Sequence, residues 1–481
     1  MVELLKAIDD VSKKKQNVSD LLDIIVREAF ERKASDIHLE AREGNNLLVR
    51  FRIDGILKDM VTIGDNMEES ILFIIKVRAK LRTDIHFAPQ DGKILFSFKK
   101  DEVDLEKIEG KKEESKEGEK KVDEEKKEEV KEEEVQEKPK DSKDKEPKEK
   151  EEKKSFFEKL KESSQKDEKE EVYRIDARIS ILPVTYGEKV VIRLLSQTNR
   201  AFGLADLGFE PDDLAKVEAS YREPYGLILA TGPTGSGKTT SLYSILKILN
   251  TREVNITTIE DPVEYNIVGV NHIQINTKSD LTFANGLRSI LRQDPNIIMV
   301  GEIRDTETAR ITVNSALTGH LVLSTVHAND AISAIPRLID MGIEPFLVAS
   351  TVNIIVSQRL ARRLCDNCKS EYSISKDGPH KEMLKFRPDV AKLLGSTDKL
   401  YKANGCSQCD NTGYSGRIGL YEVLRMNKDI RDVVISQPNT DTIYAAAKKG
   451  GYKLMIEEGV GKLKRGIIDL EELIRVVAIK E

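Results

Sequence analysis

Residues 226–240 read Gly226-Leu227-Ile228-Leu229-Ala230-Thr231-Gly232-Pro233-Thr234-Gly235-Ser236-Gly237-Lys238-Thr239-Thr240. The first six residues form a short apolar run, which predicts a buried strand. A Gly-rich turn follows, and Ser241–Leu249 continues as a helix. Glycines in such a turn let successive backbone N–H groups surround phosphate oxygens, and the helix N-terminus adds a partial positive charge. The stretch therefore predicts a nucleoside triphosphate site in a sheet covered by helices.

The residues of this turn have distinct expected roles. Lys238 is expected to reach the β- and γ-phosphates of ATP, and the Thr239 hydroxyl to ligate Mg²⁺. The predicted ATP-binding set is Gly232, Pro233, Thr234, Gly235, Ser236, Gly237, Lys238, Thr239 and Thr240.

Three further segments place acidic or histidine residues after apolar runs, at Ile256–Glu264, Ile297–Asp305 and Thr318–His327. The carboxyl ends of parallel strands meet at the edge of the sheet where ligands bind. A carboxylate there can hold the hydration shell of Mg²⁺ or orient the attacking water. A single strand-end carboxylate is more often a helix cap or an ion-pair partner. Three such segments behind one phosphate-binding turn favour a hydrolytic site.

Together these segments resemble the secretion ATPase superfamily, which drives type II secretion and type IV pilus assembly. Glu260–Glu264 is similar to its aspartate box, Gly301–Asp305 to its variant Walker B strand, and Thr318–His327 to its histidine box. Leu281–Pro295 also resembles the family, and the likeness covers nearly all of the chain outside one charged tract. Asn296 stands where the family usually has Asp, and we expect this difference to have little effect.

The resemblance implies a role for each matching residue. Glu264 would orient the attacking water or act as its general base, Glu302 would work near Mg²⁺, and His327 would sense the γ-phosphate. The residues expected to complete the nucleotide site are Glu260, Asp261 and His320.

The residues before this stretch predict a smaller α+β domain. Val18–Lys33 has apolar residues at helical spacing, and Asp36–Glu40 and Leu47–Ile53 predict strands. The region resembles the family's second N-terminal domain, a PAS-like fold whose arginines close onto the nucleotide. Arg178 and Arg193 occupy the matching positions, where guanidinium groups would complete a charge clamp on the transferred phosphoryl group. Without the resemblance, a strand arginine is interpreted as an exposed ion-pair partner.

The family's larger members carry an additional leading domain that docks on membrane partners. This chain has only about 17 residues before its first expected helix, so docking and cyclic-dinucleotide sensing through that domain are not expected. How the chain would engage a membrane platform is left open.

Residues 99–171 consist almost wholly of Lys and Glu, with some Asp and Ser. This composition cannot bury enough apolar surface to offset chain entropy, so a disordered insertion in the N-terminal domain is expected. A partly helical solvated loop and a regulatory arm are the alternatives. Nearly all of the net charge of −6 lies in this tract, which leaves the remainder of the chain near neutral.

The 4 cysteines form two CxxC pairs, Cys365/Cys368 and Cys406/Cys409. Each pair places two thiolates on one turn, and two turns complete a tetrahedral S₄ site, so a structural Zn²⁺ is predicted. A redox CxxC is the alternative, although two pairs argue against it. In the family, this module marks assembly and secretion ATPases.

The resemblance implies a homo-hexameric ATPase that acts on an inner-membrane platform protein in type IV pilus assembly or type II secretion. The N-terminus lacks a signal-peptide pattern and no apolar run could cross a bilayer, so we expect a cytoplasmic protein, peripheral at the inner face of the membrane. A DNA-uptake or nucleic-acid translocating motor is the alternative. Direct nucleic-acid binding is not expected, because Trp is absent and the folded part is near neutral. A non-hydrolysing scaffold is disfavoured by Glu264 and Glu302.

The expected fold class is α/β, with a RecA-like parallel sheet preceded by the smaller α+β domain and followed by a zinc-binding and helical part. The expected divisions are 1–98 plus 172–195 for the N-terminal domain, 99–171 for the insertion, 196–206 for a linker, 207–360 for the ATPase core, 361–425 for the zinc module and 426–481 for a helical region.

Overall fold

The chain divides into two compact units, Met1–Ser196 and Gln197–Glu481. Most of the expected insertion 99–171 and of the expected linker 196–206 lies outside the described residues. The computed structural model describes residues 2–13, 17–44, 46–64, 67–99, 172–195, 203–374 and 378–478.

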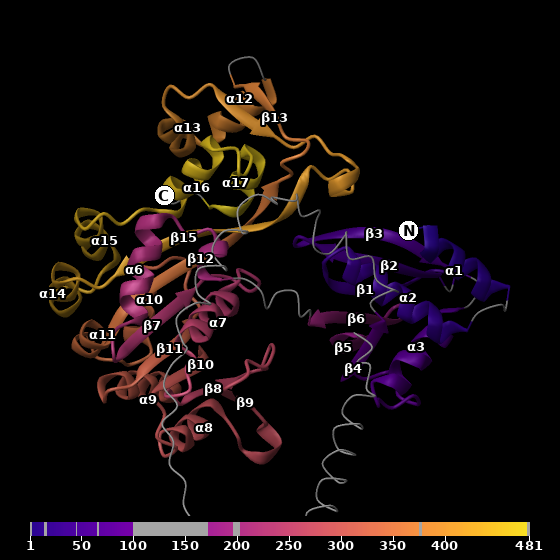
Figure 1. Cartoon of the computed structure of the whole chain (residues 1–481), viewed down its shortest axis with the longest axis horizontal. Coiled ribbons are helices and arrows are strands. Elements are labelled where there is room, and N and C mark those ends of the chain that lie inside the picture. Colours follow the sequence, from indigo (N-terminus) through magenta and orange to yellow (C-terminus); the bar gives the residue numbers. More distant parts are fainter. Residues whose placement is uncertain are drawn as a thin grey trace, which may run out of the picture. The chain divides into compact units, whose positions relative to one another are not determined.

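The first unit contains a six-stranded antiparallel sheet in the order β3-β2-β1-β6-β5-β4 (Figure 1). Lys99 at the end of β4 lies opposite Val172 at the start of β5, so the intervening tract begins and ends at neighbouring positions. The strands are β1 (Ala34–Arg42), β2 (Asn46–Ile53), β3 (Ile56–Ile63), β4 (Gln90–Lys99), β5 (Val172–Val184) and β6 (Gly187–Leu195).

Alternation along these strands separates a packed face from a polar one. Ile37 and Leu39 of β1 are fully buried in the core that the sheet shares with the helices packed on it, whereas the alternate positions of the strand carry the polar residues Asp36, His38 and Glu40. The helices are α1 (Val2–Ser12), α2 (Val18–Glu31) and α3 (Met67–Arg78).

Two elements of this unit were not predicted. The expectation of about 17 residues before the first helix is wrong, because α1 occupies Val2–Ser12 and buries Leu4, Ala7 and Val11 in the core. Strand β3 was missed because few of its residues are buried at the edge of the sheet, and the apolar alternation is therefore weak.

The second unit contains a seven-stranded sheet in the order β15-β12-β7-β11-β10-β8-β9. All neighbouring pairs are parallel except β12 and β15, so the predicted α/β fold class with a parallel sheet is confirmed. The strands are β7 (Gly226–Thr231), β8 (Ile256–Glu260), β9 (Val270–Gln274), β10 (Ile297–Ile303), β11 (Leu321–Val326), β12 (Val352–Leu364) and β15 (Tyr414–Arg425).

Helices pack on both faces of this sheet, with separate apolar cores on the two sides. Helices α6 and α7 contribute to one core, and α8 to α11 with α14 and α15 contribute to the other. Their bounds are α6 (Pro211–Tyr221), α7 (Lys238–Leu249), α8 (Phe283–Ile290), α9 (Thr306–Leu317), α10 (Ala334–Asp340), α11 (Pro345–Thr351), α14 (Lys428–Ser436) and α15 (Thr440–Lys449).

The cysteine-bearing part is continuous with this sheet. Strand β12 runs across the expected division after residue 360, and β15 returns from the cysteine segment to pair with it. A further core joins β12 and β15 to the C-terminal helices. The remaining elements are β13 (Ser370–Ser373), α12 (Gly378–Phe386), α13 (Pro388–Leu394), β14 (Lys399–Lys402), α16 (Met455–Lys464) and α17 (Leu470–Val476).

Candidate functional site

The predicted phosphate-binding turn connects β7 to α7 at the carboxyl edge of the parallel sheet. Gly235 and Gly237 have φ angles of 78° and 89°, which glycine adopts without steric cost. The tip of the turn is exposed, and Thr239 and Thr240 follow in the first turn of α7. Lys238 Nζ donates hydrogen bonds to the carbonyl oxygens of Gly232 at 2.8 Å and Pro233 at 3.1 Å. The ammonium group is therefore held against the loop that should receive the phosphates.

Glu302 and His327 lie together at the carboxyl ends of the neighbouring strands β10 and β11. His327 Nε2 is 3.2 Å from Glu302 Oε2, and Arg304 contacts the other carboxylate oxygen at 2.5 Å. The hydrogen bond to Glu302 raises the pKa of Arg304, and Asp261 adds to this shift. The structure thus brings Asp261, Glu302 and His327 to one end of the sheet.

Lys238 belongs to the same electrostatic environment. Burial lowers the pKa of its ammonium group, and the Glu302 carboxylate opposes that shift. The Lys238 ammonium group and the Glu302 carboxylate are therefore close enough to interact electrostatically.

The predicted base, Glu264, lies in the connection between β8 and β9 and is half-buried. It is close to the hydroxyl of Tyr243 on α7, whose pKa is raised by burial and by the Glu260 carboxylate. Glu264 is therefore next to the helix that carries the phosphate-binding turn.

The two predicted clamp arginines lie opposite each other on neighbouring strands of the first unit's sheet. Arg178 on β5 is paired in register with Arg193 on β6. Arg193 Nε donates to Asp36 Oδ1 at 3.0 Å, while 59% of its side chain stays exposed. Like charges opposite each other repel, so Asp36 offsets part of that cost.

The four cysteines converge into one cluster. The Sγ atoms of Cys365 and Cys406 are 3.9 Å apart, those of Cys368 and Cys409 3.8 Å, and those of Cys406 and Cys409 3.7 Å. The edge of a tetrahedron with Zn–S bonds of about 2.3 Å is about 3.8 Å long. All four ligand atoms lie within 4.8 Å of one another, so the residues fit a tetrahedral S₄ metal site.

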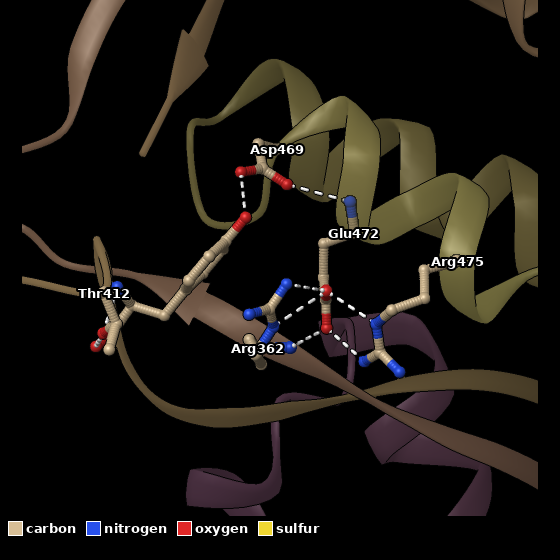
Figure 2. A network of polar contacts seen from close by, with 6 residues as sticks. Arg362, Thr412, Asp469, Glu472 and Arg475 are labelled. Carbon is tan, nitrogen blue, oxygen red and sulfur yellow. Dashed lines mark hydrogen bonds and ion pairs between the residues drawn. The ribbon is translucent and has the colours of Figure 1, made fainter. Parts of the chain in front are cut away.

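A polar network joins the cysteine segment to the C-terminal helix α17 (Figure 2). The Tyr414 hydroxyl donates to Asp469 at 2.6 Å, and Asp469 caps α17 through the Glu472 N–H. Arg362 of β12 donates to Glu472 through its backbone and its guanidinium, and Arg475 contacts the same carboxylate. These bonds join the cysteine segment, β12 and α17.

Residues 11–107 and 168–475 match the model of a family described as type II/IV secretion system protein. The chain belongs to this family. The resemblance inferred from the aspartate, Walker B and histidine segments is therefore confirmed.

Curated members of the family align with nearly the whole chain. A type IV pilus assembly ATPase PilB from Myxococcus xanthus is 36% identical over 98% of this chain and 69% of its own length. A type II secretion system protein E from Pseudomonas aeruginosa is 36% identical over 95% of this chain and 74% of its own length. The chain spans only 42% of the PilB from Thermus thermophilus, which is also 36% identical and covers 94% of this chain. These names confirm the expectation of an ATPase at the level of the family.

Solved structures support the fold. The Legionella pneumophila ATPase DotB superposes with a TM-score of 0.57 at 17% identity and covers 94% of both chains. The pilus retraction motor PilT with bound ADP gives a TM-score of 0.52 at 23% identity, over 94% of this chain and 95% of its own.

Glu260 does not offer its carboxylate to the nucleotide site as expected from the family's aspartate box. The side chain is buried and accepts hydrogen bonds from Tyr243 at 2.6 Å and from Thr258, also at 2.6 Å. His272 Nε2 accepts the Ile267 N–H, so its Nδ1 carries the proton and donates to Glu260 at 2.9 Å. Because the carboxylate is buried and is bonded to interior groups of α7, β8 and β9, Glu260 ties these elements together instead.

His320 lies at the opposite edge of the sheet from the phosphate-binding turn. Its carbonyl oxygen accepts the N–H of Gly226, the first residue of β7, at 3.1 Å. The length of β11, about 20 Å, separates it from the carboxyl ends of the strands. The expectation that His320 contacts the nucleotide is therefore wrong. His327 of the same histidine segment lies at the carboxyl end of β11, as expected.

Two buried side chains at the site were not predicted from the sequence. Thr231 Oγ1 donates to the Ala328 carbonyl oxygen at 2.8 Å and accepts the Ala328 N–H at 3.0 Å. These bonds fix the position of Ala328, which directly follows His327. Gln358 of β12 hydrogen-bonds to the phosphate-binding turn itself. A polar amide inside an apolar strand was the available signal, because buried polar groups need partners.

Proposed function

We propose that the chain is the hexameric motor ATPase of a type IV pilus assembly or type II secretion machine. The observation that carries this proposal is the phosphate-binding turn with Lys238 and Glu302 in one electrostatic environment, beside His327. The names of the PilB and type II secretion relatives support the motor role.

In this proposal each residue acts on ATP through its position. Backbone N–H groups of the turn and Lys238 bind the phosphates, Glu264 orients or deprotonates water, and His327 responds to the γ-phosphate. Thr239 and Glu302 are the residues that would hold Mg²⁺ and its hydration shell. Bound there, the ion would neutralise charge on the phosphates.

Two further assignments concern the rest of the molecule. The cysteine cluster holds a structural Zn²⁺, because four thiolates leave no open coordination position for chemistry. The partner of the motor is an inner-membrane platform protein, and the chain works at the inner face of the cytoplasmic membrane. In the described part of the chain, no helix has the length and apolar character needed to cross a bilayer.

The central test replaces Lys238 with Ala. This change removes the cation that contacts the β- and γ-phosphates, so phosphate release from ATP by the purified full chain should fall to background. Lys216→Ala is the matched control, because Lys216 pairs with Asp213 on α6, away from the turn. Wild-type turnover in Lys238→Ala would rule out the site. Strong stimulation of the wild-type chain by DNA would instead favour the nucleic-acid translocating motor.

A further inference from the structure

Gln358 lies beside Gly232, the first residue of the phosphate-binding turn, because β12 is the neighbour of β7 in the sheet. Strand β12 runs parallel to β7, and Ser357 is in register with Thr231, so the next residues along are Gln358 and Gly232. Gln358 is only 1% exposed within a strand that is otherwise mainly apolar here. Its amide must therefore find partners inside the protein.

The nitrogen of the Gln358 amide bonds to the turn, and the oxygen of the amide bonds to the helix that follows the turn. Nε2 donates to the Ser236 carbonyl at 2.6 Å, and Oε1 accepts the Ser241 hydroxyl at 2.8 Å. Both contacts are buried. One side chain thus connects the loop to the first turns of α7.

The loop also packs directly against this residue. A Cβ atom added to Gly232 would lie 2.4 Å from the Gln358 carbonyl oxygen, and one added to Gly237 would lie 2.9 Å from Nε2. A side chain at Gly232 would therefore require a shift of the backbone, and one at Gly237 would displace the Gln358 amide from its present position. The absence of a Cβ at these two positions therefore serves the fit to β12 as well as the conformation of the turn.

The contact to Ser236 fixes a peptide group that matters for phosphate binding. In a trans peptide, the carbonyl of one residue and the N–H of the next point in opposite directions. The Ser236 carbonyl is held toward Gln358, so the N–H of Gly237 points away from β12. Backbone N–H groups of such turns are the donors that surround phosphate oxygens.

We propose that Gln358 is a positioning residue that holds the phosphate-binding turn in the conformation that receives the β-phosphate of the nucleotide. Lys238 also supports the turn, but its bonds to Gly232 and Pro233 must be exchanged for phosphate when nucleotide binds. The partners of Gln358 are a carbonyl oxygen and the Ser241 hydroxyl, which the proposed site does not use to bind phosphate, so nucleotide binding does not require these bonds to break. This inference rests on the proposed nucleotide site and adds the residue that preorganises it.

The test compares nucleotide affinities of full-length variants. Gln358→Met keeps the length of the side chain and removes both hydrogen bonds, and Ser241→Ala removes one of them. Ser357→Ala is the matched control on the same strand. Ser357 is fully buried, its hydroxyl has no hydrogen-bond partner within the described chain, and its side chain points to the opposite face from Gln358.

Kd values for ADP and AMP are measured by displacement of a fluorescent ADP analogue. The deciding quantity is the ratio of the Kd for ADP to the Kd for AMP in each variant. In Gln358→Met, we expect ADP binding to weaken about tenfold or more while AMP binding changes much less, because AMP lacks the β-phosphate. Ser241→Ala should shift the ratio in the same direction by a smaller factor, and Ser357→Ala should leave it unchanged. A purely structural role would weaken ADP and AMP equally.

The outcomes separate this inference from the proposed function. A wild-type chain that binds no ADP would overturn the proposed function itself. Wild-type binding with an unchanged ADP-to-AMP ratio in Gln358→Met would overturn the role of Gln358. If Gln358→Met fails to fold, as judged by its thermal transition without nucleotide, Ser241→Ala decides, and an unchanged ratio in that variant counts against the proposal.

Discussion

Glu302 is held from two sides at the end of β10. One carboxylate oxygen contacts Arg304 and the other contacts His327, and only 13% of the side chain is exposed. A carboxylate fixed in this way keeps its direction without reorganisation during turnover, and such preorganised charges contribute most to catalysis. The basic residues around Glu302 also compensate for the removal of its charge from water.

Replacement of Glu302 with Gln should therefore separate binding from hydrolysis. The amide keeps the size of the side chain but loses the charge, so we expect phosphate release to fall about 100-fold while ADP affinity changes only a few-fold. Steady-state turnover and ADP displacement measure the two effects. Glu307→Gln is the control, because Glu307 is an exposed carboxylate on α9 that pairs with Arg288. Turnover in Glu302→Gln close to that of the wild type would contradict the role.

Whether an element could be predicted depended on whether its signal is local. The β7–turn–α7 unit was predictable because strand, glycines and lysine are contiguous. Helix α1 carries Leu4, Ala7 and Val11 at helical spacing, so its signal is local as well. The contact of Gln358 with the turn depends on β12 lying next to β7, and that order joins residues more than 100 positions apart.

The orientation of side chains at strand ends was likewise not available from the sequence. Glu260 ends β8, as predicted, but it packs into the interior against Tyr243 and His272. His320 precedes β11 and His327 follows it, so one histidine segment reaches both edges of the sheet. The aspartate and histidine segments predicted the strands correctly. They did not determine which side chains lie near the phosphate-binding turn.

Helix α17 gives a prediction about pH. Burial disfavours the charged form of Glu472, but hydrogen bonds from Arg475 and Arg362 outweigh burial and hold the pKa of this carboxyl below its ordinary value of 4.5. A carboxyl whose pKa is lowered on folding contributes stability above its unfolded pKa and loses it as the pH falls through the folded pKa. Glu472→Gln should therefore lower the Tm near pH 7, and the difference from the wild type should narrow below about pH 4.5.

Thermal unfolding of both proteins across this pH range measures the effect. The exposed neighbour Glu471 provides the control, and Glu471→Gln should follow the wild type at every pH. A Tm difference between Glu472→Gln and the wild type that stays constant from pH 7 to below pH 4 would show that the carboxylate charge does not stabilise the attachment of α17 to β12.

At the scale of the whole molecule, the two compact units carry different parts of the proposed chemistry. The phosphate-binding turn belongs to the unit Gln197–Glu481, and Arg178 and Arg193 belong to the unit Met1–Ser196. Each unit has its own apolar core, so neither requires the other to bury its interior. The predicted arginine clamp and the phosphate-binding turn therefore belong to separately packed parts of the chain.

The double variant Arg178→Ala, Arg193→Ala tests whether hydrolysis needs both units. If the guanidinium groups stabilise charge that develops on the transferred phosphoryl group, turnover should fall at least about 100-fold. ADP affinity should change little, because the turn that binds ADP is untouched. Arg174→Ala is the control, since Arg174 lies on the same strand and face as Arg178 but opposite Ser97. An equal loss of ADP affinity and turnover would assign the arginines to ground-state binding. Unchanged turnover would rule out the clamp and leave Arg193 as an ion-pair partner of Asp36 in the sheet.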